Sequence, residues 1–154
     1  MSLFAPVSAL ATAREIEAGR LTANEALAHA QMRIAAHGRD VEVFAHEPPQ
    51  WTVHDGPLSG ISVGIKDVFD TYDMPTAYGS PIYADHQPAT DSTLVTMLRN
   101  CGATIAGKTV TTEFAWFSPG KTRNPHNLDH TPGGSSSGSA AGVAAGFFPA
   151  AIGT

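Results

Sequence analysis

The stretch Thr131-Pro132-Gly133-Gly134-Ser135-Ser136-Ser137-Gly138-Ser139, which runs on into the small residues 140–146, decides the fold. A flexible Gly/Ser linker does not lead directly into an apolar segment, whereas this stretch does. We therefore predict a tight loop that opens a buried helix, because glycine adopts backbone conformations that are closed to other residues. The first N–H groups of such a helix have no partner within it and are free to hold an anion or an oxyanion.

Known nucleotide-binding motifs do not fit this loop. Gly133 and Gly138 have the spacing of a phosphate-binding loop, but Ser139 stands where that motif requires lysine. The dinucleotide pattern G-x-G-x-x-G is absent. A purely structural loop, in which the serines cap the helix, remains open at this point.

A second informative segment is Ile61-Ser62-Val63-Gly64-Ile65-Lys66-Asp67, which alternates apolar and small residues as a strand does. The alternation places Lys66 on the same face as Ser62 and Gly64, so that there is room around its ammonium group. An ordinary lysine that reaches solvent from a strand end is the alternative interpretation.

The remaining segments predict an α/β fold. Strand, helix and strand follow one another as in a βαβ unit. Thr22 and Glu25 form a capping-box pattern, and Asp91 is a candidate helix cap. The expected helices cover residues 7–18, 22 to about 37 with a stop at Gly38, and 92–100; the expected strands cover 41–45, 61–67, 103–107 and the region 147–152, with a turn from Lys108 to Glu113.

Composition narrows the classes of partner. The net charge of −5, without any cluster of Lys and Arg, argues against a nucleic-acid surface. No stretch has the length of a membrane span and no signal peptide is recognisable, so that we expect no membrane contact and a cytoplasmic protein. The single cysteine, Cys101, excludes an internal disulfide framework and is predicted to be a small buried residue at a helix end. His29 and His37 are expected to lie on the solvated face of their helix, and we expect no metal.

Several segments, in one order, resemble the amidase signature family of serine hydrolases. They are Gly60 to Asp67, Gly102 to Thr109 with Glu113-Phe114-Ala115, Asn124-Pro125, and Pro132 to Ala141. The short connection between Glu113 and Gly133 is most similar to malonamidase-type members. The resemblance implies a mixed β-sheet covered by helices, with paired N-terminal helices. It implies that residues 1–154 are the N-terminal portion of a single amidase signature domain, that they end before the nucleophile, and that residues 1–38 form a helical arm.

The resemblance also implies roles in a Ser–cis-Ser–Lys triad. Lys66 would be the general base, and Ser135, joined to Gly134 by a cis peptide bond, would relay the proton. A lysine is a base only when neutral, which requires that burial lower its pKa from about 10.4. The nucleophilic serine and the oxyanion hole would lie beyond Thr154. Supporting roles fall to Gly133, Gly134, Ser136, Ser137 and Thr154, and no cofactor is implied.

The implied function is hydrolysis of a small linear or acidic amide to a carboxylate and ammonia, with a small-molecule substrate and a possible homodimer. This chain alone is expected to be inactive. One alternative is the glutaminase component of a tRNA-dependent amidotransferase (its A component), which the short connection disfavours; the other is a non-catalytic truncated fragment. Pocket positions are conceivable for four residues, although we favour ordinary packing or surface roles for each: Tyr78, Phe114, Trp116 and Arg123.

Overall fold

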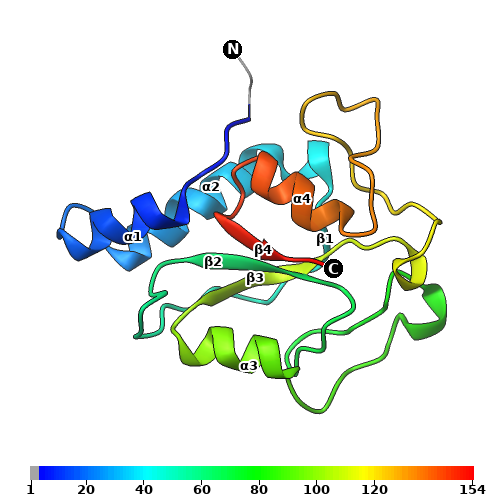
Figure 1. Cartoon of the computed structure of the whole chain (residues 1–154), viewed down its shortest axis with the longest axis horizontal. Coiled ribbons are helices and arrows are strands. Elements are labelled where there is room, and N and C mark those ends of the chain that lie inside the picture. Colours follow the sequence, from blue (N-terminus) through cyan, green and yellow to red (C-terminus); the bar gives the residue numbers. More distant parts are fainter. Residues whose placement is uncertain (1–3) are drawn as a thin grey trace.

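The computed structural model describes residues 4–154, which form a four-stranded sheet in the order β1-β3-β2-β4 (Figure 1). The first three residues of the predicted N-terminal arm lie outside the described part. The central strand β2 runs parallel to both β3 and β4, whereas β1 is antiparallel to β3. The predicted mixed α/β class is confirmed. The strands are β1 (Phe44–His46), β2 (Ser62–Lys66), β3 (Thr104–Thr109) and β4 (Ala150–Ile152).

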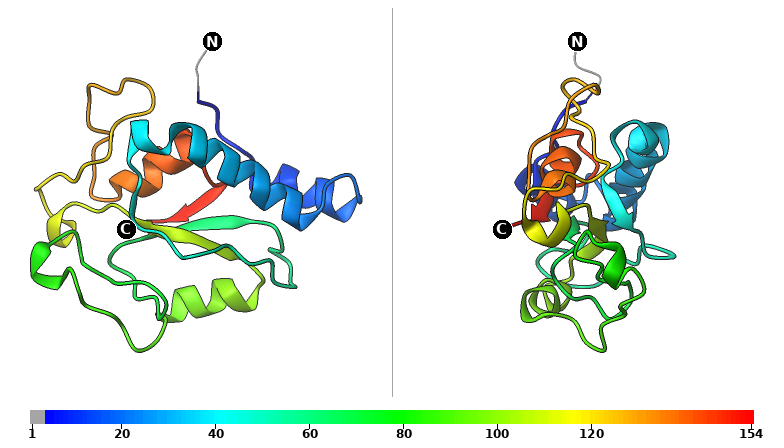
Figure 2. Two further views of the ribbon diagram at one scale, coloured as in Figure 1. Left: turned by 180° about the vertical axis from the view of Figure 1, so that it is seen from behind. Right: turned by 90° about the vertical axis from the view of Figure 1, so that its right-hand side faces the viewer.

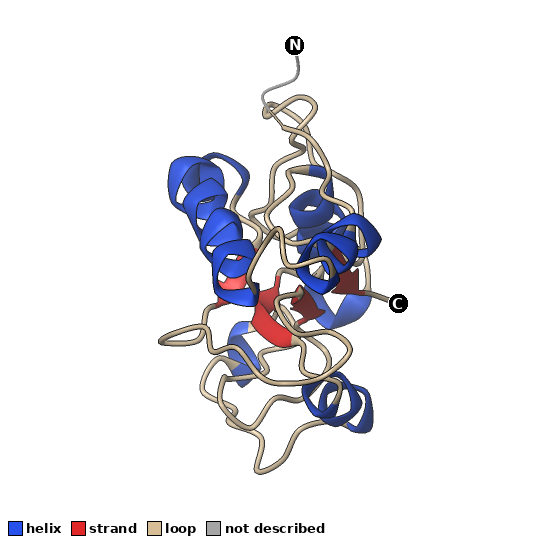
Figure 3. Cartoon of the chain, turned by 90° about the vertical axis from the view of Figure 1, so that its left-hand side faces the viewer, coloured by secondary structure: helices blue, strands red, loops and turns tan. Residues whose placement is uncertain are grey.

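Helices cover both faces of this sheet. Helix α3 (Thr93–Asn100) lies on one face, and α4 (Ser137–Ala144) lies on the other, together with α1 (Ala9–Glu17) and α2 (Ala23–Val41) (Figures 1 and 3). The view from behind shows α2 crossing in front of α4 (Figure 2). Because α3 joins β2 to β3 and α4 joins β3 to β4, the carboxyl ends of three parallel strands meet at one edge. Ligands bind at such an edge in open α/β sheets.

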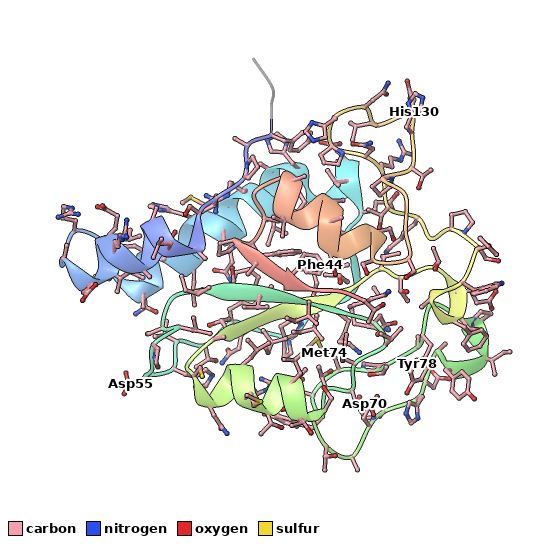
Figure 4. The ribbon with its side chains drawn as sticks, in the orientation of Figure 1. Phe44, Asp55, Asp70, Met74, Tyr78 and His130 are labelled. Carbon is pink, nitrogen blue, oxygen red and sulfur yellow. The ribbon has the colours of Figure 1, made fainter. Side chains whose placement is uncertain are left out.

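The alternation predicted for β2 is confirmed. Val63 and Ile65 pack with Val95 of α3 in one apolar cluster. Gly64 faces the opposite side, where an added Cβ would meet the ring of Phe148 at 2.8 Å. Two core clusters therefore flank the strand. Figure 4 shows Phe44 on the α4 side of the sheet and Met74 on the α3 side.

The paired N-terminal helices are present, and the capping box of α2 is confirmed. The Thr22 amide donates to the Glu25 carboxylate over 2.8 Å, and the Glu25 amide donates to Thr22 Oγ1 over 3.2 Å. The predicted stop at Gly38 is wrong. The helix continues to Val41, which is fully buried, and ends where Glu42 adopts a left-handed conformation at φ 56°. Burial of Val41 in the added turn outweighs the weak helix propensity of glycine.

Three further predictions are corrected. Asp91 does not cap α3, because its carboxylate accepts hydrogen bonds from the Tyr72 amide and from Arg99. Cys101 follows α3 as expected but is exposed. Lys108 belongs to β3 and not to a turn. Within residues 4–154, no helix is both long enough and apolar enough to cross a membrane.

Candidate active site

Lys66 ends the central strand at the edge where the three parallel strands meet. Its side chain is fully buried. The Nζ atom donates to Ser135 Oγ and to Thr154 Oγ1, each at 2.6 Å. Ser135 precedes α4, and Thr154 follows β4, so that three separate segments meet at one amine.

The environment of Lys66 favours a neutral amine. Burial lowers the pKa of Lys66 from its ordinary value. No carboxylate among the described residues forms an ion pair with its Nζ. Since desolvation acts without a compensating negative charge, Lys66 has the property that a lysine base requires. The alternative of a lysine that reaches solvent is wrong.

The loop before α4 is held against the turn that follows β3. The peptide bond between Gly134 and Ser135 is cis, as the resemblance implies. The Thr112 amide donates to the Ser135 carbonyl over 3.0 Å. A Cβ on Gly134 would meet Thr112 Cγ2 at 2.7 Å, and Gly133 has a φ of 85°, so that both positions suit glycine.

The other serines fasten this loop to neighbouring strand ends and do not cap the helix. Ser136 is the N-cap residue of α4 but makes no side-chain cap. Its Oγ instead accepts from the Thr154 amide at 3.1 Å and donates to the Thr154 carbonyl at 3.3 Å. Ser137 Oγ donates to the Val110 carbonyl at 3.1 Å, and Ser139 Oγ donates to the Ile152 carbonyl at 2.8 Å. The helix-capping alternative is therefore wrong.

The start of α4 is only partly available to an anion. The Gly138 amide, in the first turn, donates to the Val110 carbonyl over 2.9 Å. A Cβ on Gly138 would meet the Val43 carbonyl oxygen at 2.4 Å, which shows how closely the backbones approach. Because Gly138 has no side chain, α4 can pack closely against the backbone that precedes β1 and follows β3.

A hollow of 510 Å³ opens beside Ser135. Trp116 and Phe117 line it and pack edge to face, with ring centroids 4.8 Å apart. Of the four pocket positions weighed from the sequence, only Trp116 lines this hollow. Phe117 was missed, because the irregular segment that carries it has no periodicity. The complete lining is Thr112, Ala115, Trp116, Phe117, Pro119, Thr131, Gly133, Gly134 and Ser135.

The other three positions have ordinary contacts. The Tyr78 hydroxyl donates to Asp70 Oδ1 at 3.3 Å, and Figure 4 shows both residues in loops on the α3 side of the sheet. The Phe114 ring lies at the edge of the Tyr83 ring. Arg123 lies 3.9 Å from Glu42. The preference for packing and surface roles holds for these residues.

A second buried lysine was not anticipated from the sequence. Lys108 Nζ lies 2.8 Å from Asp67 Oδ1, and both side chains are buried. The Nζ also donates to Thr76 Oγ1 at 2.6 Å and to the Pro75 carbonyl at 3.1 Å. Burial lowers the pKa of Lys108, and the Asp67 carboxylate acts in the opposite direction. Lys108 is thus compensated, whereas Lys66 is not.

The described residues contain no group of three or more His, Cys, Asp and Glu side chains that could hold a metal ion. Figure 4 shows His130 in the outer loop that precedes α4, far from the end of β2. The contacts of the buried Lys66 amine with the hydroxyl groups of Ser135 and Thr154 can support proton transfer.

Known proteins share this sequence and fold. The amidase family model matches residues 20–154. The glutamyl-tRNA(Gln) amidotransferase A component of Acidothermus cellulolyticus is 50% identical over 105 residues, which are 64% of this chain and 21% of that protein. The crystal structure of the Thermotoga maritima A component matches at a TM-score of 0.81 and 31% identity, over 96% of this chain and 33% of that one.

A peptide amidase in complex with the inhibitor chymostatin matches at a TM-score of 0.84 and 31% identity, over 96% of this chain and 36% of that one. The chain thus spans between about a fifth and just over a third of the length of these relatives. None of these matches tests the malonamidase-type detail. The family match, which extends over most of the residues, establishes that the chain belongs to the amidase signature family.

Proposed function

We propose that this chain supplies the base and the proton relay of a site that hydrolyses a carboxamide to a carboxylate and ammonia. One observation carries the proposal: the buried Lys66 amine, without a carboxylate partner, lies 2.6 Å from Ser135 Oγ. In the complete protein, these residues form the N-terminal portion of one domain, and the nucleophilic serine belongs to the segment that follows Thr154.

The proposed steps conserve protons. Neutral Lys66 accepts a proton from Ser135, while Ser135 takes one from the nucleophilic serine, which attacks the amide carbonyl. As the C–N bond breaks, Ser135 returns a proton to the departing nitrogen and recovers one from Lys66. Water then releases the carboxylate from the acyl-enzyme by the same relay. The roles proposed for Gly133, Gly134, Ser136, Ser137 and Thr154 are to keep Ser135 in reach of the amine.

The named relatives support an amidotransferase setting more than a small acidic amide. The A components of glutamyl-tRNA(Gln) amidotransferases from several organisms match up to 88% of the chain. We propose, as the first candidate, that the complete protein releases ammonia from glutamine for a partner protein. We therefore propose a different partner protein in place of the possible homodimer that was expected from the sequence.

A free-standing amidase for neutral linear amides is the second candidate, and two observations favour it. The connection between Glu113 and Gly133 is short. The hollow beside Ser135 is lined by aromatic and small residues, with no ionisable side chain among them. Glutamine carries a charged carboxylate and a charged amine, which such a lining does not satisfy.

Ammonia release by the complete protein tests both candidates. Glutamine would be compared with a series of neutral carboxamides, with and without partner proteins. Under either candidate, we expect Lys66→Met and Ser135→Ala to lower kcat/KM by about 10²–10⁴-fold, the usual share of acid–base catalysis. Lys121→Met removes an exposed lysine and serves as the control. Full activity of the Lys66→Met variant would refute the proposed site.

A further inference from the structure

We propose that Glu113 is a positioning residue for the hollow beside Ser135: its carboxylate, bound by Ser80, fixes the turn that forms one wall of the hollow. The inference rests on the proposed function, because it takes this hollow to be the place where the amide substrate binds. Glu113 itself does not line the hollow. It acts through the backbone of residues 112–118, which we call the wall turn.

The wall turn carries two aromatic side chains that the rest of the described chain covers little. Trp116 and Phe117 line the hollow but are 72% and 81% exposed, and their rings pack against each other. Side chains with so few buried contacts are not held in place by core packing. The position of this wall therefore depends on the backbone of the turn.

The backbone of the wall turn has a conformation that needs support. Phe114 and Ala115 have φ of 49° and 56°, in a region that residues other than glycine rarely adopt. The Glu113 amide donates to the Ser118 carbonyl over 3.0 Å, and the Glu113 carbonyl accepts from the Trp116 amide over 2.9 Å. Positive φ at bulky residues persists only where surrounding contacts impose it. The wall turn therefore depends on contacts from outside as well.

The loop of residues 78–80 supplies a backbone contact of this kind. The Phe114 amide donates to the Tyr78 carbonyl over 2.8 Å. The short helical turns that the two segments form, Pro81–Tyr83 and Glu113–Ala115, lie side by side at the right of Figure 1 and at the left of Figure 2. The wall turn is thus docked on the loop that precedes Pro81–Tyr83.

The hydrogen bond between Ser80 and Glu113 links the side chains of the two segments. Ser80 Oγ donates to Glu113 Oε1 over 2.8 Å, and Ser80 is only 3% exposed. The same oxygen accepts from the Ile82 amide at 3.4 Å, which fixes the hydroxyl within its own loop. Because the hydroxyl has a single proton, its donor capacity is committed to the carboxylate. Removal of either side chain therefore breaks this link.

A separate contact holds the wall turn to the catalytic loop. The Thr112 amide donates to the Ser135 carbonyl over 3.0 Å, and the Glu113 side chain takes no part in this bond. Loss of the Glu113 carboxylate should therefore displace the rings of the wall and leave Ser135 in place. The expected consequence is weaker binding of the substrate, without a slower chemical step.

The test in the chain follows Trp116, which is the remaining tryptophan in a Trp51→Phe background. Time-resolved fluorescence anisotropy measures the motion of its ring. Glu113→Ala and Ser80→Ala should each lower the residual anisotropy by about a third, the difference between a rigid and a flexible segment. Glu113→Gln keeps an oxygen acceptor for Ser80 and should preserve the anisotropy. Unchanged anisotropy in both alanine variants would overturn the proposal.

Two further variants distinguish the link from general destabilisation. Glu47→Ala removes an exposed glutamate elsewhere and should leave the anisotropy of Trp116 unchanged. The double variant Ser80→Ala/Glu113→Ala should lower it no further than either single variant, because both single variants break the same bond. Losses that add in the double variant would contradict the inference. If Glu113→Ala fails to fold, Ser80→Ala, which removes a single oxygen atom, carries the same prediction.

Activity of the complete protein provides an independent measurement. With an aromatic carboxamide as substrate, Glu113→Ala and Ser80→Ala should raise KM by about tenfold, the value of one displaced ring contact, with kcat unchanged. Glu113→Gln should retain the low KM. A fall in kcat at unchanged KM would place the effect on Ser135 and contradict the inference. Because the anisotropy of Trp116 needs no substrate, failure of the proposed function leaves that measurement intact, and the two failures are distinguishable.

Discussion

Lys66 Nζ and Ser135 Oγ lie 2.6 Å apart although 69 positions separate the two residues in the chain. The contact forms because Lys66 is the last residue of β2 and the loop before α4 lies at the same end of the sheet. Ser135 makes no other side-chain hydrogen bond among those described, whereas Ser136 ties the loop to Thr154. The two neighbouring serines therefore have separable roles.

Alanine substitutions at these serines should separate catalysis from stability. Ser135→Ala removes only the bond to Lys66, so that we expect loss of amide hydrolysis in the complete protein with little change in the free energy of unfolding. Ser136→Ala removes two bonds to Thr154 and should lower the free energy of unfolding by about 1–2 kcal/mol. Urea unfolding and ammonia release measure the two effects. Equal stability losses in the two variants would contradict this separation.

Lys66→Met should stabilise the fold more at neutral pH than at high pH. Burial lowers the pKa of Lys66 in the folded state, so that proton binding favours the unfolded chain. This penalty is absent above the unfolded pKa of about 10.4 and grows as the pH falls towards the folded value. The gain of Lys66→Met over the unmodified chain, measured by urea unfolding, should therefore be larger at neutral pH than above that value. Lys121→Met is the exposed control, and a gain independent of pH would refute the argument.

Two Gly→Ala substitutions should change stability in opposite directions. At Gly138, a Cβ would meet backbone atoms of Val43 and Val110 at 2.4 and 2.5 Å, and these atoms cannot rotate away. We expect Gly138→Ala to destabilise the fold by about 3 kcal/mol or more, as overpacking does. At Gly38, inside α2, the nearest atom is a methyl group of Ile34 at 3.4 Å. Gly38→Ala should stabilise by up to about 1 kcal/mol, the difference in helix propensity. Thermal unfolding of both variants checks the signs.

The faces of β2 could be predicted from the sequence, because its five residues alternate without interruption and Lys66 follows Gly64 on the α4 side. The face of Lys108 could not. The register shifts between Val63 and Gly64, where the partners are Ile105 and Gly107, so that Ala106 is the extra residue of a β-bulge. A strict alternation from Ile105 would place Lys108 on the same face as Lys66. The bulge reverses this and brings Lys108 to Asp67.

The helix ends and the pocket show the same limit of local patterns. Gly38 is a good local signal for a helix end, but the helix continues because Val41 becomes buried in the core. Asp91 is a good local signal for a helix cap, but its carboxylate accepts a hydrogen bond from Arg99 instead. Both outcomes depend on tertiary packing. Phe117 lines the hollow through an irregular turn in which Phe114 and Ala115 both have positive φ. No periodicity encodes such a turn.

Trp116 offers a way to decide between the two candidate substrates. It is 72% exposed in the chain, lines the hollow beside Ser135 and is one of two tryptophans. If neutral amides occupy this hollow, Trp116→Ala in the complete protein should raise KM for an aromatic carboxamide by about tenfold, the value of one lost ring contact, and leave KM for glutamine unchanged. In a Trp51→Phe background, the fluorescence of Trp116 should respond to the aromatic carboxamide alone. If the fluorescence of Trp116 also responds to glutamine, and Trp116→Ala lowers the activities on glutamine and on the carboxamide equally, the amidotransferase setting is favoured, with glutamine bound against this ring.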